Sequence, residues 1–140
     1  MSKSKLFSLS AVLLALFLLA VTSVFAGNRA SFDNPRVTTC SVSGITIAGT
    51  LRLSDTVYVE EYLNDNLTNT FTGAAGAYSG YVAYYSASSL PYTWRTVLSF
   101  KDSSGILLEQ YVLEGDCSAV DTGTVTFREV ELDEFSLNIG

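Results

Sequence analysis

Apolar side chains occupy every second position in one stretch after another between Arg36 and Leu132. A period of two places alternate side chains on opposite faces of a β-strand, whereas no stretch after residue 26 keeps the α-helical period of 3.6 for more than two turns. Thr, Val, Tyr and Ser are abundant and proline is rare, as is typical of strands. The alternation therefore predicts an all-β domain.

The predicted strands follow one another at intervals of roughly ten residues, with turn residues between them. The clearest strand is residues 45–54, whose apolar face is formed by Ile45, Ile47, Leu51 and Leu53. Residues 67–72 give a weaker, Thr-rich strand suited to a sheet edge, and residues 27–36 give an irregular lead-in containing Asn34 and Pro35. About seven to eight strands without a helix predict a two-layer antiparallel β-sandwich, and a small β-barrel is the alternative.

The best hairpin joins residues 92–100 to residues 106–113, with an Asp at the start of the loop and a Gly at its end. Slipping the register by one residue would set Leu98 against Glu109, so the register with apolar partners is favoured. That register places Phe100 opposite Ile106, Leu98 opposite Leu108, and Trp94 opposite Val112.

The last strand is expected at residues 122–132, with a β-bulge near Arg128 and Glu129 where the inward phase changes. Residues 133–140 then alternate apolar and polar side chains, with Phe135, Leu137 and Ile139 in phase. We expect this end to add a short edge strand.

Residues 1–26 have the three parts of a secretory signal peptide: two early lysines, an almost wholly apolar run at residues 6–20, and Ala26 at a small-residue cleavage point. An uncleaved anchor helix is the alternative, because residues 6–25 nearly match the length that spans a bilayer. Cleavage is favoured because a polar, turn-rich stretch follows directly. We therefore expect a secreted, extracellular product with its lead-in at residues 27–36 and its β-sandwich domain at residues 37–140.

Both cysteines, Cys40 and Cys117, lie after the signal. An even number of cysteines in an exported domain points to a disulfide bond, and two cysteines allow one intramolecular pairing. Closing a loop of this length stabilises the fold by at most about 4–5 kcal/mol in the chain-entropy model. Two free thiols are the alternative.

The expected mature chain has six basic and 14 acidic residues, a net charge of −8. Such a chain is repelled by nucleic acids and by anionic membrane surfaces, so neither is an expected partner. The acidity serves solubility in the simplest interpretation.

The sequence contains no histidine, which excludes Ser-His-Asp and Cys-His catalysis and His-ligated zinc. Glycoside hydrolysis needs two facing carboxylates, and by residue type the candidates are Glu60 with Glu61, Glu114 with Asp116, and Glu129 with Glu131. Neighbouring carboxylates on strands are more often solvated. Residues 64–66 favour an Asx turn over a calcium loop. We expect no enzyme activity, no cofactor and no metal.

Six aromatic residues crowd into residues 78–94. Alternation places Tyr78 and Tyr84 with Val82 on a face assigned to the core, and Tyr81 and Tyr85 on the opposite face. Exposed tyrosine rings offer flat contact area for proteins or sugars at a small entropy cost. Tyr81, Tyr85 and Tyr92 are therefore the candidate ligand-binding residues, and core filling is the alternative interpretation.

The run from Tyr92 to Cys117, YTWRTVLSFKDSSGILLEQYVLEGDC, resembles the later strands of immunoglobulin-like and fibronectin type III-like modules of bacterial secreted or surface proteins. It departs from true immunoglobulin domains because Trp94 lies far from Cys40, and fibronectin type III modules usually lack the disulfide. The resemblance implies an immunoglobulin-like sandwich with an adhesion or interaction role.

Three functional hypotheses follow from the sequence. The first is a secreted, non-enzymatic binding or adhesion module for an extracellular protein or glycan. The second is a structural subunit of an extracellular surface assembly, with residues 27–36 donated as a strand to a neighbouring copy. The third, and least favoured, is a carboxylate-dependent glycoside hydrolase.

Overall fold

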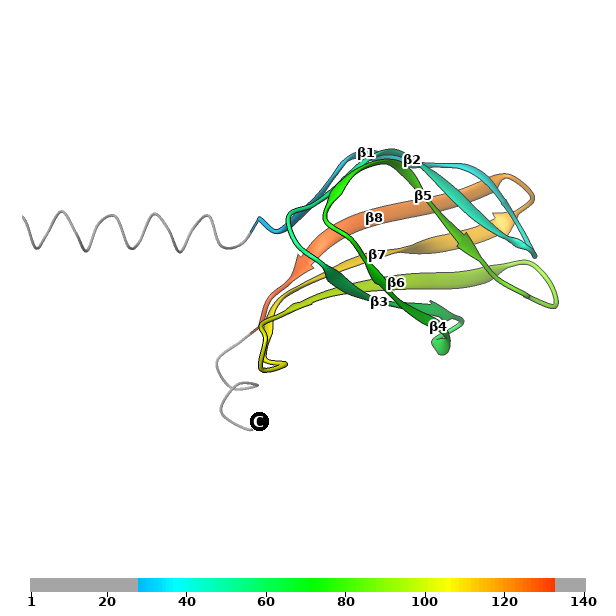
Figure 1. Cartoon of the computed structure of the whole chain (residues 1–140). Helices are drawn as coiled ribbons and strands as arrows, with labels where there is room; N and C mark the ends of the chain where they lie inside the picture. The colour runs from blue at the N-terminus through cyan, green and yellow to red at the C-terminus, as the bar shows by residue number, and fades with distance from the viewer. Residues whose placement is uncertain (1–27, 133–140) are drawn as a thin grey trace, which may run out of the picture.

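A computed structural model describes residues 28–132, which form eight strands in two antiparallel sheets (Figure 1). The strands are β1 (Ala30–Ser41), β2 (Gly44–Leu53), β3 (Val57–Leu63), β4 (Asn66–Gly73), β5 (Gly76–Tyr84), β6 (Tyr92–Lys101), β7 (Leu107–Ala119) and β8 (Thr122–Val130). One sheet has the order β1-β2-β5 and the other has the order β4-β3-β6-β7-β8. The predicted two-layer β-sandwich is confirmed.

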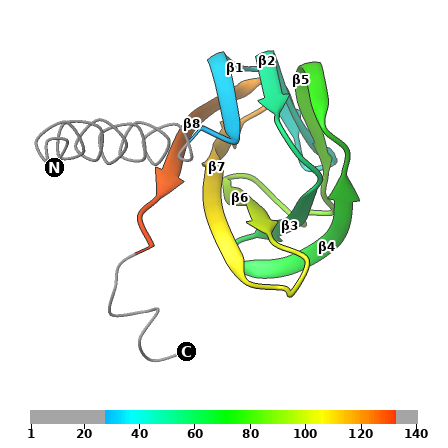
Figure 2. The same cartoon turned by 60° about the vertical axis from the view of Figure 1, so that its left-hand side comes forward.

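The two sheets meet differently at their two sides. β1 and β8, the outer strands on one side, lie next to each other (Figure 2). On the other side the outer strands are β4 and β5, which a two-residue link joins in sequence. No backbone ladder joins the sheets at either side in the described part of the chain, so the fold is a sandwich and the barrel alternative is wrong.

The core lies between the sheets and is formed by the inward rows of β2, β3 and β6. The four apolar residues predicted for β2 are all buried, as are Val57 and Val59 of β3 and Trp94, Leu98 and Phe100 of β6. The Thr-rich segment is β4, which lies at a sheet edge as its composition predicted. Period-two alternation was therefore a reliable guide to the inward face of these strands.

A disulfide bond joins Cys40 of β1 to Cys117 of β7, which confirms the predicted pairing. Both residues are buried, and the bond links the three-stranded sheet to the five-stranded sheet. The two cysteines are 77 positions apart in the sequence. The covalent link therefore holds both layers of the sandwich together across most of the chain.

The predicted register of the β6–β7 hairpin is wrong. Phe100 lies opposite Glu109 and Leu98 lies opposite Tyr111, three residues away from the expected partners. The turn chemistry was predicted correctly: the Asp102 carboxylate accepts hydrogen bonds from backbone N–H groups, and Gly105 has a φ of 87°. Leu108 is left without a cross-strand partner in a bulge, so the following residues change face.

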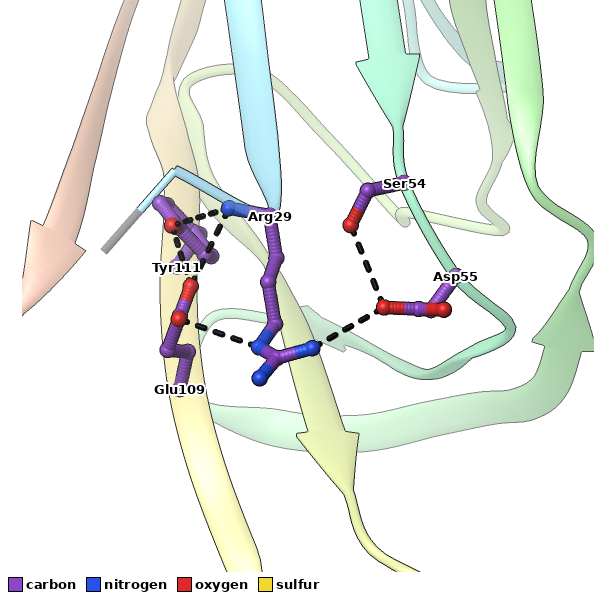
Figure 3. A network of polar contacts seen from close by, with 5 residues as sticks. All are labelled: Arg29, Ser54, Asp55, Glu109 and Tyr111. Atoms are coloured by element: carbon purple, nitrogen blue, oxygen red, sulfur yellow. Dashed lines mark hydrogen bonds and ion pairs between the residues drawn. The ribbon is translucent and has the colours of Figure 1, made fainter. Parts of the chain in front are cut away.

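The shifted register turns Glu109 into the sandwich, where its side chain has partners from a distant part of the chain (Figure 3). The Glu109 carboxylate accepts hydrogen bonds from the Arg29 backbone N–H at 3.1 Å, from Arg29 Nε at 3.0 Å and from the Tyr111 hydroxyl at 2.7 Å. Arg29 also pairs with Asp55 at 2.9 Å. A buried carboxylate is tolerated when it is paired and hydrogen-bonded in this way.

Two other expectations need correction. β8 pairs with β7 in regular register from Val130 to Gly123, so the predicted bulge near Arg128 and Glu129 is absent. Residues 30–36 belong to β1 rather than to an irregular lead-in, and Asn34 and Pro35 form an irregularity within the strand, where Asn34 has a φ of 52°.

The predicted signal peptide at residues 1–26 and the predicted edge strand at residues 133–140 lie outside the described residues. Within residues 28–132, no helix has the length and hydropathy that crossing a membrane requires.

Candidate functional site

Two of the three candidate carboxylate pairs are separated or occupied by other partners, whereas Glu129 and Glu131 line one surface pocket beside Leu108. Glu61 is buried on the inner face of β3 while Glu60 lies on the other face, so these two neighbours do not converge. Glu114 pairs with Arg128 at 3.4 Å, and Asp116 accepts hydrogen bonds from Thr124. In the described part of the chain, no three His, Cys, Asp or Glu side chains gather as a metal site would require.

The faces predicted for the tyrosines after Gly80 are reversed, whereas Tyr78 faces inward as predicted. Tyr84 is strongly exposed, whereas Tyr81 is partly buried and Tyr85 is buried. The cause is a bulge between β2 and β5 that includes Gly80, which has a φ of 94° and lies too close to the Ile47 carbonyl to accept a Cβ atom. An inserted residue reverses the alternation, so Tyr78 and Tyr81 both face the inside of the sandwich.

Tyr81 belongs to a buried polar cluster between the sheets. Its hydroxyl donates a hydrogen bond to Glu61 and accepts one from Thr96 at 3.4 Å. Asn69 of β4 donates to the same carboxylate at 3.3 Å. Burial, with the nearby Glu61 carboxylate as the second cause, raises the pKa of Tyr81. The hydroxyl therefore stays protonated and ties β5 to the opposite sheet.

The other two candidate tyrosines are also packed into the sandwich. Tyr85 and Tyr92 contact each other edge to face with ring centroids 6.0 Å apart, and both are buried. The Tyr92 hydroxyl donates to the Ser41 carbonyl at 2.7 Å, which joins β6 to the end of β1. Burial raises the pKa of both tyrosines. The exposed ring face expected of Tyr81, Tyr85 and Tyr92 is not found.

The structure places an apolar groove at the β4/β5 side of the sandwich, with a volume of about 280 Å³. Core side chains from three strands form its floor: Leu51, Leu53, Val57, Val59 and Leu98. Phe71 of β4 and Tyr78 of β5 form its walls and are 40% and 39% exposed. The hydrophobic core therefore comes close to the surface along this side.

The strands beside this groove carry no charged side chain. Residues 66–94, which include both β4 and β5, contain no Asp, Glu, Lys or Arg. The outer strands of the other side are different, because β1 contains Asp33, Pro35 and Arg36 and β8 contains Arg128 and Glu129. Charges, proline and bulges are the usual features that keep edge strands from pairing with other chains. The β4/β5 side lacks the charges and the proline.

Of the two edges, β4 is the more regular. It pairs with β3 along its whole length with one irregularity near Glu61. β5 is interrupted by the bulge at Gly80 and begins at Gly76, which also has a positive φ. An edge strand presents backbone N–H and C=O groups to solvent along its outer side. β4 is therefore the better template for a further strand.

Of the three candidate tyrosines, Tyr81 lines this groove and Tyr85 and Tyr92 do not, so the groove itself was not predicted from the sequence, although one signal for it was present. The uncharged stretch is visible in the sequence, but the groove depends on which strands end the two sheets, and that pairing is not local. The fold and the site define a class: an all-β, disulfide-linked sandwich with two uncharged edge strands beside an apolar groove. Comparison with protein-family models, with curated proteins and with solved structures finds no match to this chain.

Proposed function

We propose that this protein is an exported, non-enzymatic binding module that receives an extended segment of another polypeptide as an added strand along β4. The observation that carries the proposal is the uncharged, regular edge of β4 beside an apolar groove. In strand addition, backbone hydrogen bonds provide affinity and alternate side chains provide specificity. The inward side chains of an added strand would lie beside Phe71, over the apolar floor.

Export is supported by the signal-like residues 1–26 and by the disulfide bond, which is the form that cysteines take in oxidising compartments. The proposal includes no enzyme activity for two reasons. The sequence lacks histidine, and Glu114 and Asp116 each contact a different partner, Arg128 and Thr124. The resemblance to immunoglobulin-like and fibronectin type III-like modules remains a prediction. It implies an interaction role, which agrees with the proposal.

The experiment uses the exported, oxidised product and a set of alternating apolar/polar peptides alongside soluble glycans. We expect peptides to bind and to slow amide hydrogen exchange mainly in β4. Phe71→Glu, which puts a charge into the groove, should abolish binding. The matched control is Val120→Glu, which adds the same charge at an exposed valine in the β7–β8 turn.

Three results would contradict the proposal: binding of glycans alone, binding that protects another strand, or equal loss of binding in the Phe71 and Val120 variants. The fold of each variant is checked by the fluorescence of Trp94, which is buried and is the sole tryptophan.

A structural subunit of an extracellular assembly is the second candidate, and the same groove favours it. The strand donor predicted for it is not supported, because residues 30–41 pair with β2 of their own chain as β1. A different donor segment is therefore required.

A further inference from the structure

We infer that the strand received by the β4 groove is residues 135–139 of a second copy of this chain. This inference rests on the proposed function and names the partner of the proposed site. Three observations support it: the sequence pattern of residues 135–139, the position at which the described chain ends, and the placement of β8, which the segment follows in the sequence, and β4 at opposite ends of the five-stranded sheet.

The pattern of this segment is complementary to the groove. Phe135, Leu137 and Ile139 alternate with Ser136 and Asn138. In an extended strand the three apolar side chains share one face and are spaced by about 7 Å. The segment has no charge after Glu134, just as the β4 and β5 edges have none. It therefore offers an apolar row to the groove and a polar row to solvent.

The same segment cannot fill the groove of its own chain. Leu132 lines a surface pocket together with Leu108 of β7 and Val130 of β8. β7 is separated from β4 by β6 and β3, which is three strand spacings or about 14 Å. Phe135 is three Cα–Cα steps beyond Leu132, and these steps span at most about 11 Å. The route over the other sheet crosses β1 and β2 and is no shorter.

β8 and β4 lie at opposite ends of the five-stranded sheet, in the order β4-β3-β6-β7-β8 (Figures 1 and 2). The donor segment follows β8 in the sequence, and the acceptor edge is β4. Contact between two different surfaces of identical chains is heterologous, and it continues from copy to copy unless the rotation closes a ring. Each copy would extend the five-stranded sheet of the next, so the expected product is a linear series of subunits.

The experiment compares the exported full chain with a variant that lacks residues 133–140, by sedimentation velocity over a wide range of protein concentration. The full chain should form species larger than dimers as concentration rises, and the deletion variant should remain monomeric. Leu137→Asp in the full chain should weaken self-association by roughly 10-fold or more, because it removes one buried leucine side chain. Val120→Glu is the control, and it should assemble in the same way as the unmodified chain.

A mixing experiment tests the donor and acceptor roles separately. Phe71→Glu keeps the donor and blocks the groove, while the deletion variant keeps the groove and lacks the donor. Neither should self-associate, and their mixture should give a heterodimer and nothing larger. A synthetic peptide of residues 133–140 should bind the deletion variant and protect β4 from amide exchange.

The outcomes separate this inference from the proposed function. If unrelated alternating peptides bind β4 but the 133–140 peptide does not, the partner is overturned and the strand-binding function stands. If no extended peptide binds, both are overturned. Assembly that persists in the deletion variant, or in Phe71→Glu alone, would also overturn the inference.

Discussion

Alanine substitutions at two neighbouring positions of β7, Leu108 and Glu109, distinguish the observed register from the one that the hydrophobic pattern predicts. Leu108 is 40% exposed and Glu109 is 6% exposed. The pattern predicts the reverse, with Leu108 buried opposite Leu98. Replacing each residue with alanine therefore has opposite expected effects under the two registers.

The magnitude for Glu109→Ala follows from its contacts. The change removes an acceptor for three hydrogen bonds, from two groups of Arg29 and from the Tyr111 hydroxyl. Breaking a buried ion pair costs about 3–5 kcal/mol. The Arg29 side chain is 30% exposed and keeps Asp55 as a partner, so part of this cost is recovered through water. We expect a loss of about 2–3 kcal/mol in the free energy of unfolding.

Leu108→Ala should cost less than about 1 kcal/mol, because Leu108 lies at the surface and is not part of the core. A buried leucine would instead cost about 2–5 kcal/mol. The assay is guanidinium chloride unfolding followed by Trp94 fluorescence, supported by thermal unfolding, in which the Glu109 variant should melt roughly 10–20 °C lower. Glu109→Gln, which keeps the shape and one acceptor oxygen, should fall between the unmodified chain and Glu109→Ala. A larger loss for Leu108→Ala than for Glu109→Ala would refute the observed register.

Two further predictions concern the disulfide bond and the buried residue Tyr111. Replacing both Cys40 and Cys117 with alanine should lower the free energy of unfolding by up to about 4–5 kcal/mol, measured by chemical unfolding, and a loss below about 1 kcal/mol would contradict the loop-closure argument. Burial, followed by the hydrogen bond to Glu109, raises the pKa of Tyr111 to about 12. The folded state then holds this proton more tightly than the unfolded state, whose tyrosine pKa is about 10. The stabilisation is complete below about pH 10 and is lost as pH rises toward 12, at about 1.4 kcal/mol per pH unit. Unfolding midpoints measured between pH 9 and 11.5 should fall less steeply in Tyr111→Phe, and an unchanged slope would contradict this assignment.

The parts of the fold that were predicted correctly are those in which the local pattern and the final environment agree. β2 has an apolar inner row, and the inner row of β6 is apolar apart from Thr96. The outer positions of β2 are polar or small, so its inward face follows from alternation alone. The disulfide was predictable because two cysteines permit a single pairing within the chain. These inferences need no knowledge of which strands are neighbours.

The register of β7 could not be predicted in this way because its inner row contains Glu109. Alternation assigns a glutamate to solvent, and the partner that makes burial possible is Arg29, 80 positions away. The phase of β5 was wrong for a different reason: a bulge at Gly80 reverses it, and tyrosines occur on both sides of the bulge. In both strands, a long-range contact or a backbone irregularity outweighs the local pattern.

The candidate site was harder to predict from the sequence than the fold was. Tyrosine content led to residues that proved to be buried between the sheets, whereas the groove is bounded by Phe71 and Tyr78 at the outer strands of two different sheets. The edges of a sheet depend on the complete pairing order. The lack of charge in residues 66–94 indicates an unprotected sheet edge only when the pairing order shows that β4 and β5 are outer strands.

The position of the disulfide has a mechanical consequence for a chain that is pulled from its two ends. Cys40 and Cys117 enclose β2 to β6 and most of β7, so tension bypasses that region through the covalent bond. Within the described residues, only 28–39 and 118–132 can be drawn out, which limits the extended length to about 95 Å instead of roughly 370 Å. Under load, the β4 edge and its groove would carry no tension while the outer strands β1 and β8 are pulled away.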